Sequence, residues 1–212
     1  IPRAGELKAM VGKGFRNPTI REMYLWGPAN DALQPERMVN YELSWKQRMS
    51  DGAFSYGLSL FYISGDNMIQ TVMVDNKPMN VNTGEIENSG FEAEAAWRVD
   101  RYLSLNANYS YLHMRNKVLA SPEHKAYLGA GYRRGRWTLV GGLQYVGGLY
   151  TQVGQAETKE DFLLLNVTAS CRVLPWLDVW AKGENLLAQK YEINYGYPMP
   201  RAVFMGGVNI NI

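Results

Sequence analysis

Apolar and polar residues alternate along most of this 212-residue chain, and the alternation constrains its fold more than any other feature. Between Met38 and Met49, apolar side chains occupy every second position for most of the segment, and polar or charged ones lie between them. A period of two is typical of a β-strand with one apolar and one polar face. The pattern recurs and predicts an all-β chain of about ten antiparallel strands connected as a meander. The predicted strands are Leu7–Val11, Met38–Met49, Phe54–Tyr62, Phe91–Trp97, Leu103–Tyr111, Ala126–Tyr132, Trp137–Leu149, Leu163–Cys171, Leu177–Ala181 and Phe204–Ile212.

The connections between these strands alternate between short and mostly longer ones. The short ones are Ser50–Gly52, Val99–Arg101, Arg134–Arg136 and the turn at Leu174–Pro175. Barrels of the bacterial outer membrane have short periplasmic turns and long external loops, and several strands here are long enough to cross a bilayer at a tilt. Aromatic residues flank the short turns, as in a girdle at the membrane interface. The sequence therefore predicts a transmembrane β-barrel in the outer membrane of a Gram-negative cell. The flanking aromatics are Trp45, Phe54, Trp97, Tyr102, Tyr132, Trp137 and Trp176.

The polar face of the strands indicates what fills the barrel. It carries Glu42, Lys46, Glu92 and Glu94, together with amide side chains, which suits a wet or plugged lumen. A soluble lipocalin-like binder is the competing interpretation, but its interior would be more apolar. The 22 basic and 20 acidic residues are scattered, so no basic stripe indicates a nucleic-acid partner.

The residues that carry catalysis are sparse. There is one cysteine, Cys171, interpreted as a small apolar residue, and there are two histidines, His113 and His124. The histidines flank one loop, where an interfacial position is favoured over metal binding. No nucleophile–base spacing or phosphate loop is present, and Glu92 and Glu94 suit ion pairing. We therefore expect no enzyme, no catalytic residue, no metal and no cofactor.

Several short segments, in order along nearly the whole chain, resemble motifs of the TonB-dependent receptors. Two departures from the family pattern stand near the end: Pro200 is followed directly by Arg201 without an intervening glycine, and the last residue is Ile212 where many outer-membrane barrels have Phe. The matching segments are Gly14–Tyr24, Leu33–Glu36, Asn40–Glu42, Asn88–Glu92, Glu184–Leu187, Lys190–Glu192 and Gly196–Arg201.

The resemblance implies a 22-stranded barrel filled by an N-terminal plug domain. Residues 1–212 would then be the C-terminal portion of that barrel, a single-domain fragment without plug or signal peptide. It further implies uptake of a small nutrient across the outer membrane, with the lipid bilayer and, through the missing plug, the TonB complex as partners. A complete small barrel acting as a passive channel or adhesin is the alternative.

Aromatic and basic residues on the predicted external loops are the candidate ligand-binding residues. They suit an anionic, ring-bearing ferric siderophore through stacking and cation–π contacts. The simpler interpretation is that the rings pack the loops against one another. Haem, cobalamin and an oligosaccharide stay open, although the first loop lacks the histidine that haem receptors place there. The candidates are Arg16, Arg21, Tyr24 and Trp26 in the first loop, and Tyr195, Tyr197 and Arg201 in the last.

Overall fold

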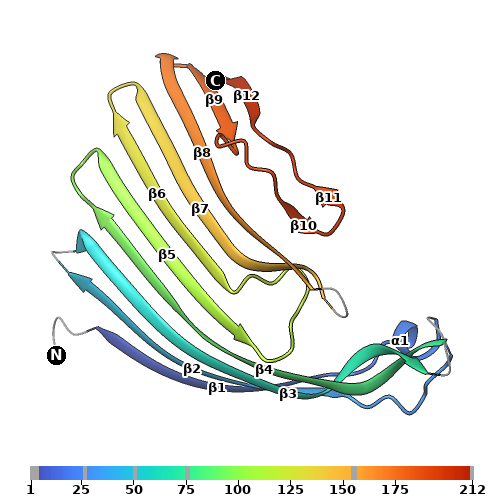
Figure 1. Cartoon of the computed structure of the whole chain (residues 1–212). Coiled ribbons are helices and arrows are strands. Elements are labelled where there is room, and N and C mark those ends of the chain that lie inside the picture. Colours follow the sequence, from blue (N-terminus) through green and yellow to red (C-terminus); the bar gives the residue numbers. More distant parts are fainter. Residues whose placement is uncertain (1–4, 26–27, 50–51, 75–76, 154–156, 211–212) are drawn as a thin grey trace.

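The computed structural model describes residues 5–25, 28–49, 52–74, 77–153 and 157–210, most of which belong to one antiparallel sheet (Figure 1). Ten strands lie in the order β1-β2-β3-β4-β5-β6-β7-β8-β9-β12, so each pairs with the next strand of this sheet along the chain. The predicted meander of about ten strands is confirmed. The strands are β1 Glu6–Arg16, β2 Glu36–Met49, β3 Phe54–Val74, β4 Lys77–Arg98, β5 Leu103–Met114, β6 His124–Arg134, β7 Trp137–Gln152, β8 Thr158–Leu174, β9 Leu177–Glu184 and β12 Val203–Ile210.

The sheet is curved and open. Its two edges are β1 and β12, which lie on opposite sides of the molecule (Figure 1). Three small elements lie in the loops: helix α1 (Ile20–Tyr24), and strands β10 (Glu192–Asn194) and β11 (Tyr197–Pro198), which form a hairpin. Within the described residues, no helix is long and apolar enough to cross a membrane.

The register gathers the polar residues on the concave face. Ser44 and Ser59 lie directly opposite each other, and the same level continues through Glu92 to Ser110 and Lys125. These residues line a hollow of about 770 Å³ that spans β1 to β6. One ion pair crosses a whole strand there, between Lys46 on β2 and Glu94 on β4 at 2.9 Å. The polar face of the predicted alternation is therefore the inner face of the curved sheet.

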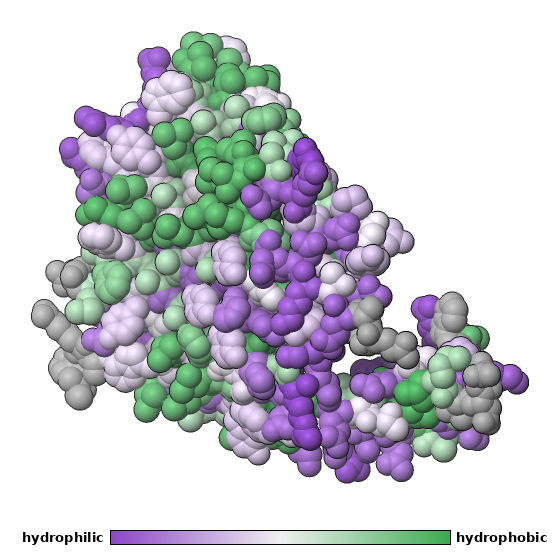
Figure 2. Space-filling view, in the orientation of Figure 1, coloured by the Kyte–Doolittle hydropathy of each residue, from purple (hydrophilic) through white to green (hydrophobic). Residues whose placement is uncertain are grey.

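The opposite face exposes large apolar side chains. Leu58, Leu60 and Val179 are each more than two-fifths exposed, as they would be if they faced lipid. Figure 2 shows hydrophobic residues gathered over the upper strands and hydrophilic ones toward the lower right, where the long loops lie. Buried hydrophobic residues are few among those described, because a single curved sheet has no second layer to pack against.

Short turns and aromatic residues lie at the same end of the sheet. Phe54 and Trp97 are direct partners across β3 and β4, beside the first two turns. Trp137 and Trp176 flank the other two and are about half exposed. Gly135, at the tight turn between β6 and β7, has a φ of +60°, a conformation that favours glycine. The aromatic residues predicted to flank the short turns thus lie toward that end of the sheet.

Two features of the loop end were not predicted. Strand β3 continues far past Tyr62, and β4 begins well before Phe91. The sequence did not indicate this extension, because polar and apolar residues do not alternate regularly there. Helix α1 begins after Thr19, whose side chain and Glu22 form a reciprocal capping box.

Candidate functional site

The candidate ligand residues lie in two loops at the end of the sheet opposite the short turns. Arg16 ends β1 and Arg21 lies in α1, whereas Tyr195 lies between β10 and β11. The two loops belong to opposite edges of the sheet, so the described residues do not bring the two groups into contact (Figure 1). Trp26, the fourth candidate of the first loop, lies outside the described residues.

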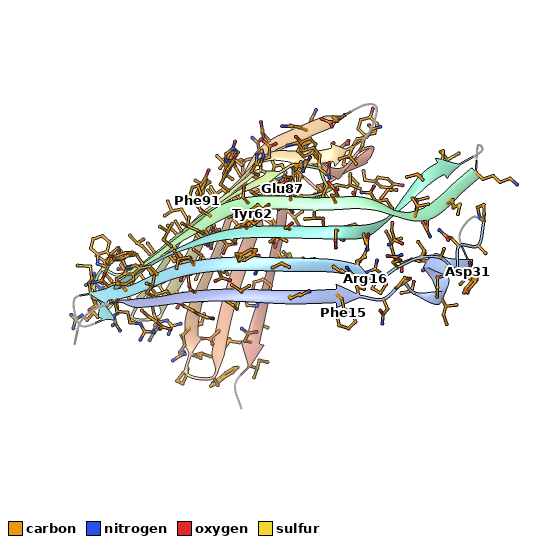
Figure 3. All side chains as sticks on the ribbon, turned by 90° about the horizontal axis from the view of Figure 1, so that it is seen from below. Phe15, Arg16, Asp31, Tyr62, Glu87 and Phe91 are labelled. Atoms are coloured by element: carbon orange, nitrogen blue, oxygen red, sulfur yellow. The ribbon has the colours of Figure 1, made fainter. Side chains whose placement is uncertain are left out.

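The first loop is organised around Arg16. Its Nη1 and Nη2 atoms each donate to the carboxylate of Glu22 at 2.9 Å, and its Nε donates to Glu36. These bonds raise the pKa of Arg16 and lower the pKa of Glu36. Together with the N–H of Thr19, Arg16 lowers the pKa of Glu22 to about 2. The Arg16 guanidinium, labelled in Figure 3, is therefore already bonded within the protein.

Two asparagines of β4 hold the first loop on the β3–β4 hairpin. The amide of Asn80 donates to the carbonyl of Glu22 at 2.8 Å, and Asn30 donates to the carbonyl of Asn80 at 2.8 Å. Asn82 exchanges two hydrogen bonds with the backbone of Gln34, at 2.7 and 2.9 Å. Asn80 is buried, so its own bonds are partly shielded from water, whereas those of Asn82 are exposed. Tyr24, at the end of α1, remains half exposed.

The last loop is anchored by Asn185. This residue is 5% exposed, and its side chain bonds the backbones of Gln189 and Pro200. The ring of Tyr191 packs against the ring of Phe162 on β8, with centroids 4.1 Å apart and planes tilted by 32°. Tyr191 therefore packs the loop against the sheet, as the simpler interpretation of the loop aromatics expected.

Three other residues of the last loop are accessible. Tyr195 is 61% exposed, Tyr197 is 74% exposed, and Arg201 is also exposed. Arg201 lines a hollow of about 380 Å³ together with Lys190 and Met199. Among the described residues, none of the three candidate side chains has a hydrogen bond or an ion pair, so each is available to a ligand.

A cluster of one carboxylate and three hydrogen-bond donors, centred on Glu123, was not predicted from the sequence. Its Oε1 accepts hydrogen bonds from Tyr150, Lys159 and Lys117. The four residues are spread over more than 40 positions, so no local spacing signals the cluster. The sequence does show Lys117 and Glu123 in one loop, but it does not show that Tyr150 of β7 lies beside them.

His113 and His124, the two histidines, lie on either side of the β5–β6 loop. His124 lies between Tyr109 and Tyr111, and its Nδ1 is 2.8 Å from the Tyr109 hydroxyl. Across the described part of the chain, no three His, Cys, Asp or Glu side chains are grouped as metal ligands. His124 lies among tyrosines, as an interfacial residue would.

Comparison with known proteins gives a family. The model of the family "TonB dependent receptor-like, beta-barrel" matches residues 5–186. The chain is 24% identical over 198 residues to the vitamin B12 transporter BtuB of Photobacterium profundum, covering 88% of this chain and 32% of that protein.

Solved structures share the fold. The ferric enterobactin receptor PfeA of Pseudomonas aeruginosa superposes with a TM-score of 0.80 at 16% identity, over 99% of this chain and 38% of that one. The copper transporter OprC gives 0.79 at 16% identity, over 97% and 37%. The chain thus spans about a third of the length of each relative. With the family match over most of its residues, this chain belongs to the TonB-dependent receptors and is part of an outer-membrane β-barrel.

Proposed function

We propose that the protein containing this chain is an outer-membrane receptor for TonB-dependent uptake of a ferric siderophore or a similar iron complex. Membership of the receptor family supports the mode of uptake. The ferric enterobactin receptor among the similar structures is compatible with an iron complex, as the vitamin B12 and copper transporters are with other cargo. We therefore use the chemistry of the loop residues to choose among an iron complex, vitamin B12 and copper as the substrate.

The exposed residues of the last loop are the observation that supports a ferric siderophore as the substrate. Tyr195 and Tyr197 offer accessible rings, and Arg201 offers a cation without an ion pair among the described residues. A ferric siderophore combines planar, ring-bearing chelating groups with negative charge, so it would stack on the tyrosines and pair with the guanidinium. Arg16 differs, because its guanidinium is bonded to Glu22 and Glu36. We propose that Arg16, Arg21, Tyr24 and Trp26 form a second wall of the ligand site, with Arg16 holding the shape of its loop.

We also propose that residues 1–212 form the C-terminal portion of a larger barrel. The open edges at β1 and β12 and the shorter length relative to the relatives support this. In such a barrel the polar concave face would enclose a plug domain, through which the TonB complex would act. Intact mass and N-terminal sequencing of the protein in outer-membrane preparations test this portion of the proposal. A native mass near 24.0 kDa would instead support a small barrel acting as a passive channel or adhesin.

Binding to the purified full-length protein in detergent tests the substrate class. Ferric enterobactin, ferrichrome, cyanocobalamin, haemin and Cu²⁺ are titrated separately by isothermal calorimetry. We expect one of the two iron–siderophore complexes to bind most tightly, and Arg201→Ala to weaken it about tenfold or more, because a cation that contacts an anionic ligand is lost. Selective binding of cyanocobalamin, haemin or Cu²⁺ would refute the siderophore assignment.

A further inference from the structure

Three donors converge on one oxygen of Glu123, just before β6. The Tyr150 hydroxyl donates to Oε1 at 3.0 Å, Lys159 at 3.2 Å and Lys117 at 3.4 Å. The donors come from β7, from β8 and from the loop between β5 and β6. Both ammonium groups also lie near the ring of Tyr150, with Nζ at 4.6 Å from its centroid for Lys159 and 5.4 Å for Lys117. We call these four residues the Glu123 clasp.

Backbone hydrogen bonds also join the Glu123 loop to β7. The N–H of Ala120 donates to the carbonyl of Tyr150 at 2.8 Å, and the N–H of Glu123 donates to the carbonyl of Gly148 at 3.3 Å. Gly148 has a φ of +63°, and a Cβ atom there would lie 2.9 Å from Oε2 of Glu123. The carboxylate therefore fills the space that a side chain at position 148 would need.

The clasp lies next to the anchor of the last loop. Thr151 follows Tyr150 directly, is 3% exposed, and its carbonyl accepts the N–H of Tyr195 at 3.1 Å. On the other side of Tyr150, Leu149 is buried in a small cluster against which Ile193 packs. The last loop therefore rests on the residues that flank Tyr150.

An isolated surface ion pair would contribute little, but the clasp differs from one. The Tyr150 side chain is almost fully buried, and the Glu123 side chain is about one quarter exposed. Burial acts to raise the pKa of Glu123, yet the bonds from Lys159 and Tyr150 outweigh it and lower that pKa. Hydrogen bonds to a shielded, ionised carboxylate are stronger than those between neutral groups.

We propose that Glu123 is a positioning residue: by fixing Tyr150 it holds Thr151, and through Thr151 it holds Tyr195, Tyr197 and Arg201 in the geometry that binds ligand. The ligand part of this inference rests on the proposed function, whereas the coupling between Glu123 and the last loop does not. A carboxylate that touches no ligand would then control the ligand site from a neighbouring loop.

Hydrogen exchange of the full-length protein in detergent, followed by mass spectrometry, tests the coupling. Glu123→Gln removes the charge, and Tyr150→Phe removes only one hydroxyl. Glu94→Gln is the matched control, because it breaks an ion pair on the same concave face near β2–β4. Heat-modifiable migration in gels first establishes that each barrel is folded.

We expect Glu123→Gln to speed exchange in residues 189–201 by about tenfold, the factor expected when hydrogen bonds to a charged group are lost. Tyr150→Phe, the milder change, should act in the same direction, and Glu94→Gln should leave this segment as in the wild type. Wild-type exchange in residues 189–201 of both clasp variants would overturn the inference. Should Glu123→Gln fail to fold, Tyr150→Phe decides the question by the same readout.

Calorimetric titration with ferric enterobactin and ferrichrome adds the ligand arm. For whichever probe binds, Glu123→Gln is expected to weaken binding about tenfold, and by a smaller factor once Tyr195→Ala is present, because the Tyr195 contact can then be lost only once. Faster exchange with unchanged affinity would overturn the positioning role. If neither probe binds the wild type, the siderophore assignment fails, and the exchange measurement still decides whether the clasp holds the loop.

Discussion

Replacement of Asn185 should release the last loop while the barrel stays folded. Its side chain makes three hydrogen bonds to backbone groups, with Nδ2 donating at 2.9 and 3.1 Å and Oδ1 accepting at 3.0 Å. Each neutral bond contributes about 0.5–1.5 kcal/mol net, so Asn185→Ala should cost the loop about 2–4 kcal/mol. Asn185 also has a φ of +48°, where alanine is disfavoured by about 1 kcal/mol. The total is about 3–5 kcal/mol.

Two further variants separate these contributions. Asn185→Gly loses the same side-chain bonds but tolerates the backbone conformation, so it should cost about 1 kcal/mol less than Asn185→Ala. Asn108→Ala removes an amide from the concave face that has no side-chain hydrogen bond among the described residues, and it should have little effect.

Limited proteolysis and hydrogen exchange of the full-length protein measure the result. Residues 185–202 should become cleavable and exchange faster in the alanine variant, with the strands unchanged. Protection equal to the wild type in Asn185→Ala would refute the reasoning that this side chain anchors the loop.

Three other outcomes follow from the structure. The pKa of Glu22 is lowered to about 2 from an ordinary value of 4.5, so its contribution to loop docking is complete above pH 4.5 and is lost as the pH falls toward 2. Pepsin cleavage within residues 17–35 should therefore rise across that range, and an equally steep rise in Glu22→Gln would contradict this origin. Leu60→Arg, on the face proposed to meet lipid, should destabilise the barrel by about 2–4 kcal/mol in urea unfolding from vesicles, whereas Ser59→Arg on the concave face should cost much less. An equal loss of stability in the two variants would contradict the proposal that Leu60 faces lipid and Ser59 does not. Gly57→Val should separate Lys46 from Glu94, since a Cβ atom at 57 would lie 2.9 Å from Oε1 of Glu94. The change in stability should be small because the pair is exposed, and a clear loss of stability in the same assay would assign the pair a stabilising role.

The strands were predictable because each has one polar and one apolar face. Ser59 and Glu92 lie opposite each other on the polar face, and a period of two places both residues on that face. The same period predicts which residues lie on the apolar face. The long β3–β4 hairpin was not predictable in this way, since past Tyr62 polar and apolar residues no longer alternate regularly. Its length depends on cross-strand backbone bonds and on asparagines such as Asn80, whose partners are distant in the sequence.

The loops show a similar division. The Thr19–Glu22 capping box was a local signal for α1 and could have been recognised. The pairing of Arg16 with Glu36, by contrast, joins residues 20 positions apart, and the Glu123 clasp joins the β5–β6 loop to β7 and β8. Such contacts are set by the tertiary fold and not by spacing. Which loop aromatics pack and which remain exposed, as Tyr191 and Tyr197 differ, also required the structure.

Uptake of ⁵⁵Fe-labelled siderophore by cells that produce the full-length protein tests whether it is a TonB-dependent receptor for an iron complex. Ferric enterobactin and ferrichrome are supplied to paired strains with and without TonB, and otherwise lacking receptors for these complexes. We expect accumulation of one complex only when both the protein and TonB are present. Equal accumulation without TonB would contradict it and identify a passive channel, and no accumulation of either complex would remove iron siderophores of these two types from its substrates.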